Sequence, residues 1–241
     1  MPEEIIKEWL KVVKVVQETP DTKTLRIELK TPIGFFIPGQ FVMAGLNLAE
    51  NGKESLVRRA FSIASSPAEK KYIEITFNIV PEGKLSPHLY GLKEGGLVYI
   101  EGPYGKFNFS ENSEENLVFL GAGTGITPLM SMLRYIKGKK ITNKKTLIYS
   151  VKRPENIVYG QELLKMKKEN SLNLFTTITR PQENDPSSLT GRISQEMIKK
   201  CVPDFKNSVF YMCGPPEMIE GTVKILENMG VPKEKINREQ W

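Results

Sequence analysis

Three short segments of this chain carry residue types that suit the binding of phosphates and flat rings. Segment 59–62 reads Arg-Ala-Phe-Ser, segment 121–128 reads Gly-Ala-Gly-Thr-Gly-Ile-Thr-Pro, and segment 211–216 reads Tyr-Met-Cys-Gly-Pro-Pro. A guanidinium clamps two phosphate oxygens at once, and an aromatic ring supplies stacking area at low entropic cost. Each segment alone is a weak signal, so the argument depends on their order and on the elements that position them.

The glycine-rich segment 121–128 lies where a predicted strand, Leu117–Leu120, turns into a predicted helix. Thr127 can cap this helix, Pro128 suits its first position, and Gly138 ends it. Such a turn brings the backbone close to a ligand at the helix N-terminus. The third glycine comes one position earlier than in the usual dinucleotide fingerprint, Gly-x-Gly-x-x-Gly, so the segment does not match that pattern.

Up to about residue 112, short β-rich segments are separated by Gly, Pro and Asn. Six strands at this spacing predict a six-stranded antiparallel β-barrel. The predicted strands are Trp9–Val16, Thr24–Leu29, Gln40–Leu46, Ala60–Ala64, Tyr72–Val80 and Leu97–Glu101.

From Asn116 onward, apolar or β-branched runs alternate with helical segments. This alternation predicts a doubly wound α/β domain with a five-stranded parallel sheet. The polar stretch from Ser110 to Glu115 predicts the boundary, which gives domains 1–112 and 113–241. The predicted strands are Leu117–Leu120, Thr146–Val151, Leu172–Thr179, Val209–Cys213 and Lys235–Glu239.

Composition bounds the class of protein. The 241 residues fit two compact domains, and 39% hydrophobic with 26% charged residues is ordinary for a globular protein. No apolar run approaches the roughly 18 residues of a membrane span, and the N-terminus lacks a signal-peptide pattern, so we expect a cytoplasmic protein. Two cysteines without Cys-x-x-Cys spacing and a single histidine, His88, predict no metal site.

The net charge of +6 is locally concentrated. Such a surface can attract an acidic partner, although a solvated, lysine-rich helix face explains it equally. No nucleic-acid-binding pattern accompanies the charge, and the oligomeric state is left open. The concentrated residues are Arg134, Lys137, Lys139, Lys140, Lys144, Lys145, Lys165, Lys167 and Lys168.

The three segments together resemble those of the ferredoxin-NADP(+) reductase superfamily, from about residue 8 to Trp241. The resemblance implies that the barrel binds FAD and that the α/β domain binds a nicotinamide dinucleotide. Arg59 then pairs with the FAD pyrophosphate, Phe61 packs on the cofactor, and Ser62 hydrogen-bonds near flavin N5. The early third glycine in segment 121–125 is itself a feature of this family.

Further positions follow from the same resemblance. Segments 78–80 and 83–86 match the family's second FAD segment, a strand followed by a Gly-x-x-Ser turn. Cys213 is implied to lie beside nicotinamide C4 and flavin N5, where it aligns hydride donor and acceptor; a buried thiol that only packs at the strand end is the alternative. Trp241 is a candidate lid over the flavin ring, with a frayed tail as the alternative.

The coenzyme preference depends on the residues that meet the adenosine ribose. Thr179 and Arg180 resemble the Ser-Arg pair of NADP-selective members, and segment 152–153 (Lys-Arg) and Arg192 add positive charge. We therefore expect NADPH, while NADH stays open because some NADH-dependent relatives also carry an arginine here.

The resemblance implies an FAD-dependent NAD(P)H oxidoreductase that passes a hydride between nicotinamide and FAD N5 and electrons to ferredoxin or flavodoxin. The alternatives are a reductase of free flavin, of an oxygenase component or of a haem protein, a flavin-bearing subunit of a larger redox complex, and a dinucleotide sensor without turnover. The implied catalytic residues are Ser62, Cys213 and Glu239. The implied cofactor-binding residues are Arg59, Ala60, Phe61, Ser62, Asn78, Ile79, Val80, Gly83, Lys84, Leu85, Ser86, Gly123, Thr124, Gly125, Ile126, Thr127, Thr179, Arg180, Cys213, Gly214, Pro215 and Trp241.

Overall fold

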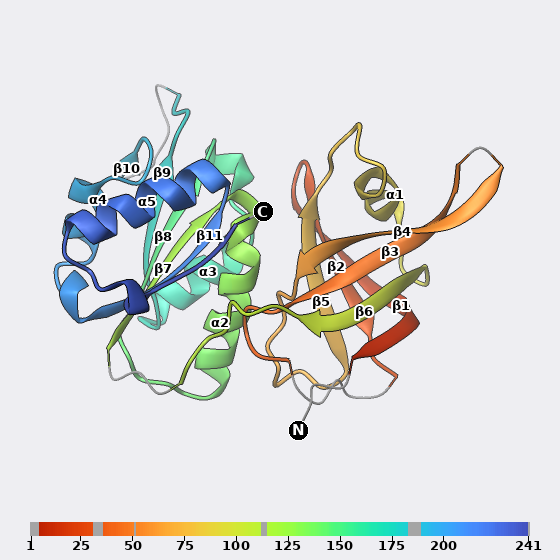
Figure 1. Cartoon of the computed structure of the whole chain (residues 1–241), viewed down its shortest axis with the longest axis horizontal. Helices are drawn as coiled ribbons and strands as arrows, with labels where there is room; N and C mark the ends of the chain where they lie inside the picture. The colour runs from red at the N-terminus through yellow and green to blue at the C-terminus, as the bar shows by residue number, and fades with distance from the viewer. Residues whose placement is uncertain (1–4, 31–35, 51, 112–114, 183–188, 241) are drawn as a thin grey trace. The chain divides into compact units, whose positions relative to one another are not determined.

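The computed structural model describes residues 5–30, 36–50, 52–111, 115–182 and 189–240, which form two compact units (Figure 1). The first unit comprises Met1–Phe109 with Met130–Gly138, and the second comprises Ser110–Leu129 with Lys139–Trp241. Helix α2 (Ile126–Gly138) is therefore divided, because its residues from Met130 onward belong to the first unit.

The first unit is built on a six-stranded antiparallel sheet in the order β4-β3-β6-β1-β2-β5. An antiparallel bridge between Ile63 and Ile75 joins the two ends of this order, so the sheet curls into the expected barrel. Its elements are β1 (Ile6–Thr19), β2 (Thr22–Glu28), β3 (Phe41–Glu50), β4 (Lys53–Ser62), β5 (Tyr72–Asn78), the short helix α1 (Ser86–Gly91) and β6 (Leu97–Tyr104).

Side-chain alternation along the strands builds the barrel core. Successive side chains of a strand point to opposite faces, so every second residue can be buried. In β1, β2, β5 and β6, most inward positions hold β-branched residues or leucine, which suit a pleated surface. They include Leu10 and Val12 in β1, Leu25 and Ile27 in β2, Ile73 and Ile75 in β5, and Val98 and Ile100 in β6.

The second unit contains a parallel six-stranded sheet in the order β10-β9-β8-β7-β11-β12. The chain runs outward from β7 to β10 and then returns to the other side of β7, which is the doubly wound arrangement expected from the sequence. Its strands are β7 (Asn116–Ala122), β8 (Lys145–Val151), β9 (Asn173–Ile178), β10 (Leu189–Thr190), β11 (Ser208–Gly214) and β12 (Ile236–Gln240). The prediction of five strands is one strand short, because it missed β10. With only two residues, β10 is too short to give an apolar run.

Helices α3 (Gly160–Lys168), α4 (Gln195–Cys201) and α5 (Pro216–Asn228) complete the second unit. Buried residues of α4 and α5, such as Ile198 and Leu226, pack in one cluster with Val118 of β7 and Met212 of β11. The strands β7 and β11 are buried along almost their whole length, as expected when both faces of a parallel sheet are covered. Among the described helices, none is long and apolar enough to cross a membrane.

Candidate functional site

The Arg-Ala-Phe-Ser segment forms the last four residues of β4, an edge strand of the first sheet. Arg59 and Ala60 are exposed, whereas Phe61 and Ser62 are half-buried. The ring of Phe61 packs against Phe77, with 5.5 Å between ring centroids, and contacts the barrel core. The strand therefore carries an exposed guanidinium close in sequence to a phenylalanine ring that is fixed by packing against the barrel core.

Two adjacent arginines, Arg58 and Arg59, occupy this strand, and the structure distinguishes them. Arg58 forms an ion pair with Glu101 of β6, whose side chain is only 10% exposed. Arg59 donates a hydrogen bond to the backbone oxygen of Arg58 at 2.8 Å, and its side chain lies at the surface. Because successive side chains of a strand alternate, the Arg58–Glu101 pair leaves Arg59 on the other face.

Glu101 is held by several neighbours besides Arg58. The hydroxyl of Tyr104 donates to its Oε1 at 2.7 Å, and Lys7 Nζ lies 3.6 Å from the same oxygen. The pKa of the Glu101 carboxyl is lowered, chiefly because of the Tyr104 hydrogen bond; burial opposes the shift and the Arg58 charge supports it. The carboxylate form is thus favoured in the folded state.

We predict that the stabilisation from Glu101 is lost in acid. Because the pKa is lower in the folded state, the stabilisation is fully present when the pH is above the ordinary value of 4.5. The stabilisation is lost as the pH falls through the lower folded-state pKa. Urea unfolding of wild type and Glu101→Gln should give a clear difference at about pH 7 that narrows towards about pH 3. A difference that stays constant across this range would contradict the prediction.

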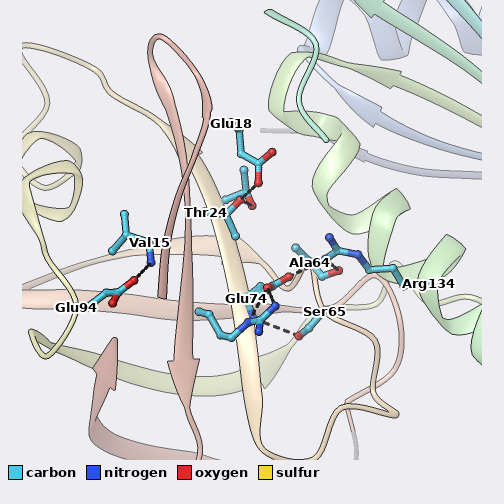
Figure 2. Close-up of polar contacts among 10 residues, drawn as sticks. Val15, Glu18, Thr24, Ala64, Ser65, Glu74, Glu94 and Arg134 are labelled. Carbon is cyan, nitrogen blue, oxygen red and sulfur yellow. Dashed lines mark hydrogen bonds and ion pairs between the residues drawn. The ribbon is translucent and has the colours of Figure 1, made fainter. Parts of the chain in front are cut away.

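The chain beyond Ser62 is fixed by a buried ionic network (Figure 2). Glu74 of β5, whose side chain is 8% exposed, accepts hydrogen bonds from Arg26 at 2.8 Å and from Arg134 of α2 at 2.8 Å. The same nitrogen of Arg134 donates to the backbone oxygen of Ala64 at 2.9 Å. The Ser65 hydroxyl accepts from the Glu74 amide at 3.1 Å. These contacts fix residues 64 and 65, which follow the Arg-Ala-Phe-Ser strand.

Two residues of the predicted basic surface, Arg134 and Lys145, are not free surface charges. Arg134 is only 19% exposed and is paired with Glu74, so it is not a free surface charge. Lys145 donates to the backbone oxygen of Ile141 at 2.8 Å, and burial lowers its pKa. The remaining lysines of the group are exposed.

The second predicted FAD segment forms a compact loop between β5 and α1. The Ser86 hydroxyl accepts from the Val80 amide at 2.9 Å, and the Gly83 amide donates to the Val80 oxygen at 2.8 Å. A Cβ at Gly83 would lie 3.0 Å from both the Ser86 hydroxyl and the Val80 oxygen, so the turn fits glycine closely. Within this loop Lys84 is exposed and Leu85 is buried in the barrel core, while Asn78 and Ile79 lead into it from β5.

The glycine-rich segment forms a 3-10 turn, Gly123–Gly125, between β7 and α2. Gly123 has a φ of +53°, a left-handed conformation that favours glycine. Thr127 is the second residue of α2, and its hydroxyl donates to the Thr124 oxygen at 2.7 Å. The prediction that Thr127 caps the helix and Pro128 takes its first position is therefore wrong: the helix starts at Ile126, two residues before Pro128, directly after the 3-10 turn.

The backbone of the Cys-Gly-Pro-Pro segment passes directly beside this turn. A Cβ at Gly125 would lie 2.3 Å from the Cys213 oxygen and 2.8 Å from the Gly214 nitrogen. Both contacts are with backbone atoms, which cannot swing aside. The structure thus brings Gly125, Cys213 and Gly214 together, with Pro215 following before α5.

Cys213 lies near the end of β11, opposite Glu239 on β12 and Gly121 on β7. Its side chain is 1% exposed, and burial raises the pKa of the thiol far above its ordinary value, with the Glu239 charge adding to the shift. The group is therefore a neutral thiol, suited to van der Waals contact rather than to nucleophilic chemistry.

The predicted ribose-phosphate residues follow neighbouring strands of the same sheet. The Thr179 hydroxyl donates to the Val151 oxygen at 3.2 Å, while Arg180 is exposed. Arg153 lies 4.0 Å from Glu155 and Arg192 lies 3.8 Å from Glu217, all with largely exposed side chains. Exposed pairs of this kind are weak, so the guanidiniums can exchange partners. Trp241, the candidate lid, lies outside the described residues.

Two family models match the chain. The oxidoreductase FAD-binding domain matches residues 9–109, and the oxidoreductase NAD-binding domain matches residues 119–224. Together with the fold, these matches show that the chain belongs to the FAD- and NAD(P)-binding oxidoreductases of the ferredoxin-NADP(+) reductase superfamily. Its cofactors are FAD and a nicotinamide dinucleotide.

Individual relatives agree with this class. A glycine betaine monooxygenase reductase subunit of Pseudomonas aeruginosa is 31% identical over 96% of this chain and 63% of its own length. The chain thus spans about 63% of the length of that curated relative. The flavohem-like FAD/NAD binding domain of a Vibrio cholerae nitric oxide dioxygenase has a TM-score of 0.86 at 20% identity, covering 97% and 98% of the two chains. A Neisseria gonorrhoeae ferredoxin NADP+ reductase with bound FAD and NADP has a TM-score of 0.82 at 24% identity, covering 97% and 98%.

The residues present fit both cofactors. The exposed Arg59 supplies the guanidinium that a pyrophosphate needs, and the half-buried Ser62 adds a hydroxyl on the same strand. In the second unit, α2 begins directly after the turn at Gly123–Gly125, and the positive end of a helix dipole suits a dinucleotide phosphate. Among the described residues, no group of three or more His, Cys, Asp or Glu side chains could hold a metal ion.

Proposed function

We propose that the chain is an FAD-dependent NAD(P)H oxidoreductase that passes a hydride between nicotinamide and FAD N5, and electrons to a protein acceptor such as ferredoxin or flavodoxin. The observation that carries the proposal is the succession of an FAD-binding and an oxidoreductase NAD-binding domain in one chain. We place their boundary near residue 112. FAD supplies the redox chemistry, accepting a hydride and releasing single electrons, while the protein supplies position and charge.

Each unit contributes its own residues to this function. In the first unit, Arg59 binds the FAD pyrophosphate, Phe61 packs on the cofactor, and the Ser62 hydroxyl donates near flavin N5. In the second unit, the neutral Cys213 thiol contacts the nicotinamide and Glu239 lies beside that thiol. The role of these groups is alignment, because holding donor and acceptor atoms about 3 to 3.5 Å apart removes much of the barrier.

We favour NADPH as the coenzyme. Arg180 is exposed, and Arg153 and Arg192 carry only weak surface pairs, so all three can turn to a 2′-phosphate. The steady-state ratio of kcat/KM for NADPH and NADH, measured with an artificial acceptor, tests this preference. A ratio above about ten supports it, because one charge-assisted hydrogen bond contributes roughly that factor. Equal values would reject it.

An oxygenase component is the second candidate acceptor, because the Pseudomonas aeruginosa relative is the reductase subunit of a monooxygenase. Either acceptor can be an acidic protein, since Lys165, Lys167 and Lys168 are exposed on α3. An acidic acceptor predicts that the reduction rate falls as salt is raised. A salt-independent rate, or preferential reduction of free flavin, would reject a charged protein partner. A cytoplasmic location is part of the same proposal.

The enzyme function itself is tested with the purified FAD-loaded chain. Anaerobic NADPH or NADH, with ferricyanide as acceptor, should give turnover that depends on both coenzyme and FAD. An FAD-loaded chain that binds the coenzyme but shows no turnover with any acceptor would instead fit a dinucleotide sensor.

A further inference from the structure

Tyr149 is a buried side chain in the middle of β8 whose hydroxyl reaches the glycine-rich turn. The residue has no exposed surface. Its Oη donates to the Gly123 backbone oxygen at 2.9 Å and accepts from the Val158 amide at 3.4 Å. One hydroxyl thus ties the turn that precedes α2 to the loop that precedes α3.

The bond to Gly123 fixes the orientation of one peptide unit. In a trans peptide the C=O and the N–H point in opposite directions. Because the Gly123 oxygen points towards the buried Tyr149, the amide of Thr124 points away from it. Thr124 is half-exposed whereas Tyr149 is fully buried, so an amide that points away from Tyr149 points away from the buried side of the turn.

A turn built from glycines does not hold this orientation by itself. Gly123 adopts a φ of +53°, and a Cβ there would meet nothing within 4 Å, so packing around its α-carbon does not restrain it. Glycine also has the largest conformational freedom of any residue. The restraint comes from hydrogen bonds to the Gly123 oxygen, which are donated by Tyr149 and by the Ile126 amide.

We propose that Tyr149 is a positioning residue for the nicotinamide dinucleotide: its hydroxyl holds the Gly123–Thr124 peptide so that the Thr124 amide donates to the bound coenzyme. The inference rests on the proposed function of the second unit as the coenzyme site. Tyr149 acts through the backbone and does not itself touch the ligand. Removing its hydroxyl therefore weakens binding more than it changes the chemical step.

The test is Tyr149→Phe, which keeps the ring and removes only the hydroxyl. The dissociation constants of NADP+ and NAD+, measured by calorimetry on the FAD-loaded chain, should rise about tenfold for the preferred coenzyme, the effect of one lost hydrogen bond. KM for the reduced coenzyme should rise in parallel, while kcat stays within about twofold.

Tyr211→Phe is the matched control. Tyr211 is also buried, lies on β11 of the same sheet, and its hydroxyl accepts from the Ser110 amide at 3.3 Å. Tyr149→Phe removes the hydrogen bonds to the Gly123 oxygen and from the Val158 amide, and Tyr211→Phe removes the one from the Ser110 amide. Both variants should therefore lose thermal stability, but Tyr211→Phe should leave both dissociation constants unchanged. Equal coenzyme affinity in Tyr149→Phe and wild type would overturn the inference, as would equal weakening in both variants.

A measurement on wild type keeps the inference testable if Tyr149→Phe does not fold. On addition of NADP+, the NMR resonance of the Thr124 amide should be among those that shift most. An unshifted Thr124 amide in a chain that binds NADP+ would overturn the role of Tyr149 and leave the proposed function standing. Failure of wild type to bind either coenzyme would instead reject the proposed function.

Discussion

Replacing Gly125 with alanine should abolish binding of the nicotinamide dinucleotide and destabilise the second unit. The added Cβ would lie 2.3 Å from the Cys213 oxygen and 2.6 Å from its carbonyl carbon. Since the obstructing atoms are backbone, the turn and the end of β11 must move apart. Overpacking typically costs about 1 to 3 kcal/mol and occasionally more, and here it would displace the amides that we propose face the coenzyme. Urea unfolding and calorimetry with NADP+ measure the two effects.

Gly221→Ala is the control for this prediction. Gly221 lies within α5, and a Cβ there meets nothing within 4 Å. Alanine is the better helix former, so this variant should be more stable than wild type by up to about 1 kcal/mol, with unchanged coenzyme affinity. Near-normal NADP+ binding by Gly125→Ala would contradict the claim that coenzyme binding requires the close contact between Gly125 and Cys213.

Replacing Glu74 with alanine should destabilise the first unit by about 3 to 5 kcal/mol, because a buried pair that loses one partner leaves an uncompensated charge. Here two guanidiniums, those of Arg26 and Arg134, lose their shared carboxylate. Arg134, whose guanidinium also donates to the Ala64 oxygen directly after the Arg-Ala-Phe-Ser strand, is then no longer held by the Glu74 carboxylate. We therefore expect faster FAD release, which flavin fluorescence measures, and a lower urea midpoint.

The matched control removes a carboxylate from an exposed pair. Glu217 and Arg192 lie 3.8 Å apart with side chains 85% and 87% exposed. Pairs of this kind contribute at most about 1 kcal/mol, so Glu217→Gln should unfold close to wild type. Glu74→Ala with the same stability and FAD retention as Glu217→Gln would show that the network does not hold the strand that we propose binds the flavin.

The strands of both units were predictable wherever burial imposes a pattern. Each of the six barrel strands and five of the six parallel strands overlaps an apolar or alternating run found in the sequence, although only residues 60–62 of β4 were predicted. The alternating pattern is missing where a strand is exposed rather than buried. The first half of β4, from Lys53, is largely exposed and is held by its hairpin partner β3, so its sequence carries no alternation. The two-residue β10 is too short for any period to show.

The candidate site divides in the same way. Its local segments are contiguous in sequence, so residue types and order were enough to find them. The supporting contacts join distant residues: Glu74 is 48 residues from Arg26 and 60 from Arg134, and Tyr149 is 26 from Gly123. No spacing rule links such pairs. The sequence therefore places Arg134 in the basic surface, and it singles out nothing about Tyr149 beyond its place in the predicted strand Thr146–Val151.

Anaerobic mixing of the FAD-loaded chain with reduced coenzyme tests the central claim most directly. We predict that the oxidised flavin band bleaches with one equivalent of NADPH per FAD, and that deuterium at the transferred C4 position slows this bleaching. Bleaching by dithionite but by neither NADPH nor NADH, in a chain shown to contain FAD, would contradict hydride transfer between the two cofactors.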